Sequence, residues 1–561
     1  MVERETRPLV RFTGLVVASI GAFALLERLS VGLGRLPPAA YERSFVAPEV
    51  LERAGRLLLD RVPIGMLALL GAVVVLALIA DGRLARWAGL RRISSIASGW
   101  NAVEDGAALR WFVGGVTGIA TWVLAAYPYN AYFDRLHLGD RLLLVLLWAA
   151  LLWRPLFVIP FAIVASAIAH QFQIPLESYS WTEMELLVRI PILFGAYWVV
   201  RSLMREHRPD AFVFLLSCLI AVDWWSSGWG KIRVGWIMHP HIDYLLLGAH
   251  ANGWLGFLDA GVVERVADVV AALRVPLMLF TLAVECGALI LLWRRWSLPA
   301  FLMLTITFHL GAFALTGIFF WKWIGVDLAF LVFLLRGRRI TRLWIFSPAQ
   351  FALSVLLIAA SGIWVAGRNL TWFDTPLTYV IRLVGVDARG GTHALPAGFF
   401  RPYSETFVLE TFSYLSPHPQ LTGPMGVTQR REVANALLAA RDSADVAALE
   451  STLGTSRYDP ERSARFDRFV ARTIQTWNRG APGGALAHVS APRHLWTFPL
   501  EAEWRGSPAI VSVDVIEITN FYDGAALREI RRRRLRTIDV GRTAESPRSE
   551  VSAASGHRPS R

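Results

Sequence analysis

Long apolar runs separated by short polar loops dominate the first two thirds of the chain. Most of these runs approach the roughly 20 residues that a helix needs to cross the hydrocarbon core of a bilayer. The pattern therefore predicts an all-α polytopic membrane bundle of about 9–11 spans within residues 1–370. The candidate spans are residues 9–27, 63–80, 111–127, 141–153, 156–170, 187–204, 210–227, 273–293, 297–318, 320–335 and 349–366.

A proline interrupts the long apolar stretch between residues 141 and 170. Arg154-Pro155 stands near its middle, and proline both removes a helix hydrogen bond and disfavours helix at the preceding residue. We therefore expect two short arms that meet at Arg154. In the irregular segment 28–62, apolar residues recur at helical spacing from Val50 to Asp60, which predicts an amphipathic helix lying on the membrane surface.

The pattern changes after about residue 370. Apolar residues recur with helical spacing at 429–454 and 462–477, and they alternate as in strands at 494–502 and 508–519. These elements predict a smaller α+β domain outside the membrane, residues 371–530. The remainder, 531–561, opens with a basic run and continues in serine, arginine and proline, so we expect a disordered tail.

Arginine placement predicts the orientation of the bundle. With the N-terminus inside, the inner loops are 1–8, 81–110, 205–209, 294–296 and 336–343, and arginines are concentrated in them. The acidic segment 171–186 then falls outside, as the positive-inside rule requires. We expect a multi-pass protein of a bacterial inner membrane with a cytoplasmic N-terminus. Lys231, the loop 228–272 and the C-terminal domain lie on the outer side in this arrangement.

Composition agrees with a membrane protein. Hydrophobic residues make up 54% of the 561 residues and charged residues only 18%. The formal net charge of +13 comes almost wholly from arginine, because Lys231 and Lys322 are the only lysines. These arginines flank predicted spans, so we interpret them as topology determinants and expect no nucleic-acid partner. Cys218 and Cys286 both lie in apolar runs without a CxxC motif, which argues against a thiol relay.

The segment Ser227-Gly-Trp-Gly-Lys-Ile-Arg-Val-Gly-Trp236 places Lys231 just past the end of a predicted span. Lysine is costly near hydrocarbon, so its presence there needs a physical reason. One interpretation is an interface lysine that snorkels and contacts tryptophan. The other is an amine kept partly dry, so that it can lose its proton and act as a base. Trp229, Trp236 and Asp223 are the nearby candidates for binding a substrate.

Two further ionisable residues interrupt apolar runs. Glu285 is alone in the run 273–293, and His309 lies in mid-span next to Phe308. A carboxylate or histidine inside a membrane segment is a candidate functional group, although either can also be a structural hydrogen-bonding residue. His239-Pro-His-Ile-Asp243 has some metal-ligand character, but no matching ligand cluster occurs elsewhere. We therefore expect polar loop residues there and no metal.

Together these clusters resemble the HTTM domain, the membrane domain shared with vitamin K-dependent γ-carboxylases. The resemblance covers about residues 110–335. Its most specific part is Ser227-Gly-Trp-Gly-Lys231 with Trp236, followed by Phe308-His309 and the segment to Phe319. Leu138-Gly-Asp-Arg-Leu-Leu143 also fits the style of the family, and His137 is the nearest candidate for a further family histidine. Gly230 stands where carboxylases often carry a second lysine.

The resemblance implies an enzyme in which Lys231 is the catalytic base, with His309 and Glu285 assigned to the same site. In the carboxylases this lysine is thought to deprotonate vitamin K hydroquinone. Oxygen then converts the product into a strong base, which removes a γ-proton from a glutamate so that carbon dioxide can add. The implied cofactor is reduced vitamin K or menaquinol, used with O2 and CO2. The implied substrate-binding residues are Trp229, Trp236, Phe308 and Asp223.

Two other functions stay open at this stage. The bundle can serve as a non-enzymatic anchor for an outer domain that binds a peptide or secreted partner during maturation. A transporter fits less well, because transporters tend to carry an internal repeat and none is apparent. Survival of chemistry after deletion of residues 371–561 would favour the enzyme. Besides the lipid bilayer, the expected partners are a lipid-soluble quinol and a peptide or protein substrate.

Overall fold

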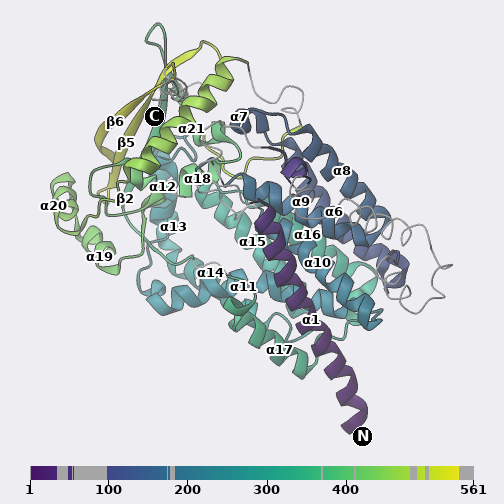
Figure 1. The fold of residues 1–561 in the computed structure, drawn as a ribbon. Coiled ribbons are helices and arrows are strands. Elements are labelled where there is room, and N and C mark those ends of the chain that lie inside the picture. The colour runs from purple at the N-terminus through teal and green to yellow at the C-terminus, as the bar shows by residue number, and fades with distance from the viewer. Residues whose placement is uncertain are drawn as a thin grey trace, which may run out of the picture.

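The computed structural model describes residues 2–34, 48–53, 55, 98–173, 175–176, 184–367, 370–409, 412–480, 489–498 and 504–541. Most of these residues are helical. Figure 1 shows a bundle of long helices beside a sheet that is flanked by shorter helices, with the N-terminus at the end of the bundle far from the sheet. This arrangement confirms the predicted combination of a helical bundle with a C-terminal region that contains a sheet.

The helices of the bundle follow the predicted apolar runs closely. Runs 111–127, 187–204 and 297–318, for example, become α6, α10 and α15. The run 63–80 lies outside the described residues. The bundle helices are α1 (Val2–Gly34), α6 (Gly106–Ala126), α8 (Leu138–Trp153), α9 (Val158–Gln171), α10 (Glu185–Met204), α11 (Asp210–Val234), α14 (Arg274–Gly287), α15 (Ser297–Thr316), α16 (Trp321–Leu335) and α17 (Pro348–Ala359).

Five of the described helices are long and apolar enough to cross a membrane. They contain the segments Pro8–Val31, Gly106–Ala126, Glu185–Met204, Asp210–Val234 and Ser297–Thr316. A sixth candidate is a pair of helices, α13 (Ala260–Ala272) and α14, which meet at a bend of 67°. Other predicted spans form shorter helices. The described chain therefore suggests a membrane-spanning protein by length and composition.

The expected break at Arg154 is present. Helix α8 ends at Trp153, Arg154 has an extended backbone, and a short 3-10 turn from Pro155 leads into α9. The start of the predicted amphipathic helix, Val50–Arg53, is helical, and the carboxylate of Asp140 accepts hydrogen bonds from the N–H groups of Val50 and Leu51. The first turn of this helix is thereby capped by the first turn of α8.

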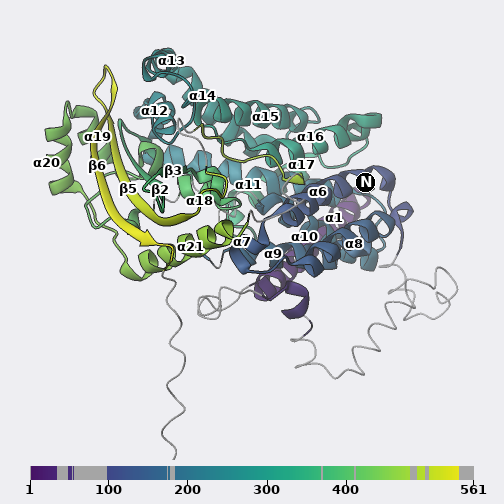
Figure 2. The ribbon, with the colours of Figure 1, turned by 90° about the horizontal axis from the view of Figure 1, so that it is seen from above.

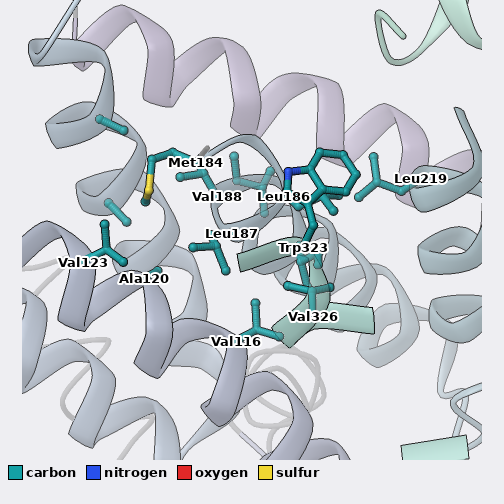
Figure 3. Close-up of a cluster of buried hydrophobic side chains, with 14 of the residues drawn as sticks. Val116, Ala120, Val123, Met184, Leu186, Leu187, Val188, Leu219, Trp323 and Val326 are labelled. Atoms are coloured by element: carbon teal, nitrogen blue, oxygen red, sulfur yellow. The ribbon is translucent and has the colours of Figure 1, made fainter. Parts of the chain in front are cut away.

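The core of the bundle lies among α6, α10, α11 and α16. Figure 3 shows Val116 and Ala120 of α6 close to Leu187 of α10 and Val326 of α16. Helices α10 and α11 have no polar face, and most of their membrane-length windows are buried inside the protein. A helix that is apolar on all sides belongs in the middle of a bundle. The central position of α11 determines where Lys231 lies.

The C-terminal region holds a four-stranded antiparallel sheet in the order β3-β2-β5-β6. A separate two-stranded ladder joins β1 to β4. Figure 2 shows α21 beside the long curved strands of this sheet. The strands are β1 (Phe373–Asp374), β2 (Leu377–Asp387), β3 (Thr392–Leu395), β4 (Val427–Thr428), β5 (Ile510–Tyr522) and β6 (Leu527–Asp539), and the helices include α18 (Ser404–Leu409), α19 (Arg431–Ala439), α20 (Ser443–Leu453) and α21 (Pro460–Asn478).

Strand β6 corrects the predicted start of the tail. The basic run from Arg531 onward is part of β6, paired in register with β5, so the sheet reaches Asp539. Several arginines of β6 have acidic partners supplied by other elements, including Arg531 with Glu450 and Arg536 with Asp467. Ion pairs with residues distant in sequence thus stabilise a strand in this basic segment, for which charge density alone predicted disorder. Residues 542–561 lie outside the described chain.

Two other expectations about strands differ from the structure. Strands β2 and β3 were not predicted, because β2 follows directly on the apolar bundle and is itself nearly continuous in apolar residues. The described part of the predicted strand 494–502 forms only a single bridge between Leu495 and Ile318. The described part of this segment therefore pairs with a residue just after the end of α15 and is not part of the C-terminal sheet.

The C-terminal region is packed tightly onto the bundle. The segment 489–498 runs across the ends of the helices, where the Phe319 N–H donates to the His494 carbonyl and the Trp496 N–H donates to the Gly317 carbonyl. Gly317 has a φ of +74°, and a Cβ there would meet Trp254 at 2.6 Å. A shared apolar cluster joins Trp236 and Met278 of the bundle side to Phe373, Met425 and Leu495.

Candidate functional site

Lys231 lies inside α11, which corrects the expectation that it follows the end of the helix. The helix continues through Gly228 and Gly230 to Val234 and ends at Gly235, whose φ of +69° provides a left-handed cap. Glycine weakens an isolated helix, so packing must hold this last turn together. Lys231 is therefore fixed on a rigid element and does not lie on a loop.

Gly228 allows α11 to approach α14 closely. A Cβ at position 228 would lie 2.8 Å from Cβ of Glu285 and 3.0 Å from Sγ of Cys286. Real Cβ atoms do not occupy such positions, so only glycine fits without a shift of the helices. The close approach places Glu285 beside Lys231, which is one turn farther along α11.

Lys231 and Glu285 form a buried ion pair. Nζ of Lys231 lies 2.5 Å from Oε1 of Glu285. The two residues are only 6% and 3% exposed. Removing both charges from water is costly, so each charge must be compensated by the other. The pair therefore holds an amine and a carboxylate in contact in an enclosed place.

Two tryptophan rings lie beside the Lys231 amine, and one of them belongs to the C-terminal region. Nζ of Lys231 lies 5.4 Å from the ring centre of Trp236 and 6.0 Å from that of Trp372. Trp372 immediately precedes β1 and donates its side-chain hydrogen bond to Asp374. Hydropathy reasoning did not identify Trp372 and Asp374, since neither residue interrupts a predicted span.

Asp374 is buried on the side of the ion pair that faces the C-terminal region. It is 5% exposed, and burial raises the pKa of its carboxyl to about 7, although the Trp372 hydrogen bond and the nearby Lys231 charge oppose the shift. Asp243, the first residue of α12 (Asp243–Ala251), is near enough to act on Asp374 electrostatically. Burial likewise raises the pKa of Asp243.

Several buried polar atoms around this site have no hydrogen-bond partner among the described protein atoms. They are Oε2 of Glu285, Nε1 of Trp236, Oδ1 of Asp374, Oδ1 of Asp243, and Nδ1 of both His239 and His241. Buried polar groups in folded proteins are usually satisfied by protein, water or ligand. A cluster of them beside an enclosed amine has the polarity expected of a binding site.

The structure places His309 and Phe308 in a neighbouring cluster. The His309 ring lies 5.0 Å from Trp224 and 4.9 Å from Phe320, and Phe308 packs edge-on against Trp224 at 5.0 Å. Trp224 precedes Lys231 by seven residues, which corresponds to the same face of α11 about 10 Å away. The predicted grouping therefore divides into the Lys231–Glu285 pair and an aromatic cage around His309.

Two predicted substrate-binding residues lie away from the amine. Trp229 is 48% exposed and stacks on Trp225 at 5.8 Å. It faces outward because two residues along a helix correspond to nearly opposite sides. Asp223 is buried more than two turns before Lys231 in α11. Of the predicted substrate-binding residues, Trp236 is the one whose ring lies near the Lys231 amine, at 5.4 Å.

The His239–Asp243 segment connects α11 to α12 and faces β1. Nε2 of His239 lies 2.9 Å from Oδ1 of Asn435, and the His239 ring is 4.8 Å from that of Phe373. His241 stacks on Tyr244 at 5.2 Å. Within the described ranges, no group of three or more His, Cys, Asp or Glu residues is arranged to hold a metal ion.

The Leu138–Leu143 motif has a structural function in this protein. Nδ1 of His137 lies 3.0 Å from Oδ2 of Asp140, and both side chains are buried. The Arg141 guanidinium donates to backbone carbonyls of Leu136, Ala125 and Tyr127, which close the end of α6. These contacts fix the connection between α6 and α8 and lie outside the Lys231 cluster.

No family model, curated protein or solved structure matches this chain. A functional assignment therefore depends on the geometry of the site and on the residues that carry the resemblance.

Proposed function

We propose that this protein is an integral membrane enzyme that uses Lys231 to deprotonate a lipid-soluble quinol, as the resemblance to γ-carboxylases implies. The observation that carries this proposal is the Lys231–Glu285 pair, which is buried, walled by Trp236 and Trp372, and held by the close contact at Gly228. A lysine that only snorkels would place its ammonium in water or among headgroups.

Glu285 makes the amine available as a base. In the proposed cycle the Glu285 carboxylate takes the ammonium proton, which leaves a neutral amine at Lys231. The amine then accepts the proton of a quinol hydroxyl. Because the site is closed to solvent by the two tryptophans and by β1, the charge that develops there is stabilised by protein groups in fixed positions. His309 lies in a separate cage, and we assign it to the shape of the neighbouring aromatic wall.

The residues around Lys231 fit a hydroquinone. Trp236 and Trp372 offer aromatic faces, and the unsatisfied Nε1 of Trp236 and Oε2 of Glu285 offer one donor and one acceptor for hydroxyl groups. When bound and oxidised by O2, reduced vitamin K or menaquinol supplies a base strong enough to remove the γ-proton of a glutamate, so that CO2 can add. In this proposal the chain's own residues bind the ring and take the first proton.

The proposal also includes the membrane topology of the chain. We propose about 9–11 spans in a bacterial inner membrane, with the N-terminus in the cytoplasm and Lys231 on the outer side. The C-terminal region then meets a peptide or protein substrate outside the membrane. The N-terminus of α1 and the sheet lie at opposite ends of the bundle (Figure 1), which supports their placement on opposite sides of the membrane.

The experiment is quinol turnover by the full-length protein in lipid nanodiscs. We expect vitamin K hydroquinone to be consumed with uptake of O2, and Lys231→Arg to lower the rate by about 10²–10⁴-fold, the usual contribution of a general base. The other lysine offers a matched control, because Lys322→Arg should keep the wild-type rate. Incorporation of labelled bicarbonate into a glutamate-containing peptide tests the carboxylation step separately.

Two results would overturn the proposal. One is a wild-type protein that consumes no hydroquinone, and the other is a folded Lys231→Arg variant that retains the wild-type rate. In either case the Lys231–Glu285 ion pair would stabilise the fold without taking part in catalysis. The non-enzymatic alternative, an anchor for a partner-binding outer domain, would then hold.

A further inference from the structure

Buried polar groups continue from the Lys231 pair toward the outer domain. Trp372 contacts the lysine side chain and donates to Asp374. The residue between them, Phe373, packs its ring on His239. Asp243, four residues after His239 in the chain, interacts electrostatically with Asp374. This series of residues carries buried polar atoms that have no hydrogen-bond partner among the described protein atoms. They are one carboxylate oxygen each of Asp374 and Asp243, and one ring nitrogen each of His239 and His241.

We infer that Asp374, followed by Asp243 and His241, forms the route by which the proton accepted at Lys231 leaves toward the outer domain. This inference rests on the proposed function. The proton leaves the Lys231 ammonium, whose N–H bond breaks, and passes through a bridging water, which gives a proton of its own to the Asp374 carboxylate as it accepts this one. It then passes through Asp243 or His241 to water, which restores the amine at Lys231 and the carboxylate at Asp374.

Asp374 is placed to release protons, whereas Glu285 is placed to hold one. Glu285 is enclosed between α11 and α14, and a Cβ at Gly228 would touch it. Asp374 belongs to the ladder between β1 and β4 at the edge of the outer domain. A carboxyl with a pKa of about 7 exchanges its proton readily at neutral pH.

Charged groups from several adjoining elements face this route. Lys231 of α11 and Asp243 of α12 act on Asp374. Arg274 of α14 and Asp268 of α13 act on Asp243, and Arg274 and His239 act on His241. Burial lowers the pKa of His241, so its ring is neutral near pH 7 and can both accept and donate a proton.

The test measures hydroquinone turnover against pH for the full-length protein in nanodiscs. We expect Asp374→Asn to lower the rate by about 10–100-fold and to remove the inflection near neutral pH from the rate profile. Asp374→Ala should regain activity with increasing formate, since a small acid can replace the missing carboxyl. The matched control is Asp467→Asn, which removes a carboxyl of α21 paired with Arg536 and should leave both rate and profile unchanged.

A second measurement does not require turnover. The chain has two lysines, so reductive methylation followed by mass spectrometry reports Lys231 separately, with Lys322 as the internal reference. If Asp374 exchanges a proton with the amine, Asp374→Asn should react several-fold faster at Lys231 near pH 7.5, while Lys322 stays unchanged. Asp374→Glu should react like the wild type.

The outcomes separate this inference from the proposed function. If Lys231→Arg abolishes turnover but Asp374→Asn and Asp374→Ala keep the wild-type rate and pH profile, the proton route is wrong and the proposed base stands. If Lys231→Arg keeps the wild-type rate, the proposed base itself fails. Unchanged labelling of Lys231 in Asp374→Asn would also overturn the route, whether or not turnover is observed.

Discussion

Gly228 determines the geometry of the candidate site at the scale of single residues. It lacks a side chain where α11 meets α14, and this allows the Glu285 carboxylate to reach Nζ of Lys231 at 2.5 Å. The sequence shows the glycine but not its neighbour, because Glu285 is 57 residues farther along the chain. Long-range proximity of this kind cannot be read from spacing.

We expect Gly228→Ala to separate α11 from α14 and to impair both stability and turnover. The added methyl group would have to lie 2.8 Å from Glu285 Cβ, and such overpacking typically costs about 1–3 kcal/mol. Thermal unfolding in detergent measures the loss. Gly311→Ala, in α15, is the matched control, since its Cβ would meet no atom within 4 Å and should not destabilise the protein. Equal melting temperatures for the two variants would contradict this account of Gly228.

The ion pair itself makes a second prediction at this scale. Lys231→Met alone leaves a buried Glu285 without its cation, which typically costs roughly 3–5 kcal/mol of unfolding free energy. Adding Glu285→Gln removes the uncompensated charge, so the double variant should recover much of this loss. Unfolding temperatures of the wild type, both single variants and the double variant complete the cycle. Additive effects would show that the two side chains do not interact.

At the scale of elements, β1 is short, but the residue before it, Trp372, brings the C-terminal region next to the Lys231 amine. Its two residues pair with β4, and the backbone of the same loop, at Met425, packs on Gly248 of α12. A Cβ at Gly248 would lie 2.3 Å from the Met425 carbonyl oxygen. This contact holds the loop that precedes β4 against the bundle, next to the ladder that contains the buried Asp374.

Burial of Asp374 predicts a pH-dependent stability. An aspartate carboxyl in the unfolded chain has an ordinary pKa of 3.8, and burial raises the pKa of Asp374 in the folded chain to about 7. Between these values the folded chain holds a proton that the unfolded chain has released, so the free energy of unfolding falls as pH rises through this window. Asp374→Asn has no such carboxyl and should gain about 1–4 kcal/mol relative to the wild type between pH 4 and pH 8. Melting temperatures at both pH values test this, and a constant difference would contradict it.

Elements whose signal is local were predictable from the sequence. Apolar runs located α10, α11 and α15, and Pro155 located the break after α8. Elements stabilised by distant partners were not. The last turn of α11 depends on contact with α14, and β6 depends on acidic groups such as Glu450 and Asp467. For the same reason Lys231 and Glu285 were identified as candidates, whereas Trp372 and Asp374 were not.

At the scale of the whole molecule, the bundle and the C-terminal region share their apolar cores. One cluster includes Trp236, Met278, Phe373 and Leu495. Deleting residues 371–561 would therefore expose bundle residues and remove Trp372 and Asp374 from the site. Such a deletion cannot separate an enzyme from an anchor, although the sequence alone suggested it as a test.

We expect the full-length protein to unfold in one transition and a chain ending at residue 370 to lose the native environment of Lys231. In the full chain the amine is 6% exposed and walled by Trp372, so it should react slowly in reductive methylation. In the truncated chain it should react as fast as a free lysine. Mass spectrometry of Lys231 in both chains provides the measurement. Equal protection would mean that the two regions are independent.

Exposed tryptophans next to arginines mark one end of the bundle. Trp111, Trp153, Trp293 and Trp296 are all more than half exposed, and each is adjacent to at least one arginine in sequence. Tryptophan favours the bilayer interface and arginine favours the cytoplasmic side. These residues lie at the start of α6, the end of α8 and the turn between α14 and α15. In the proposed orientation, this end of the bundle lies at the inner interface.

The orientation can be tested with single cysteines in a background without Cys218 and Cys286. Ala525→Cys, in the β5–β6 turn, should react with a membrane-impermeant maleimide from the outside of intact cells. His207→Cys, between α10 and α11, should react only after the membrane is permeabilised. The reverse pattern would invert the topology and place Lys231 on the cytoplasmic side.

The clamp formed by residues 489–498 links the site to the order in which the chain is synthesised. Helices α11 and α14 leave the ribosome early, whereas Trp372, Asp374 and this clamp emerge later, the clamp close to the end of translation. Until Trp372 has packed against the bundle, Lys231 lacks one of the two tryptophans beside it. In a nascent or prematurely terminated chain the Lys231 amine would thus stay exposed to water, and it would be buried only once the C-terminal region had packed onto the bundle.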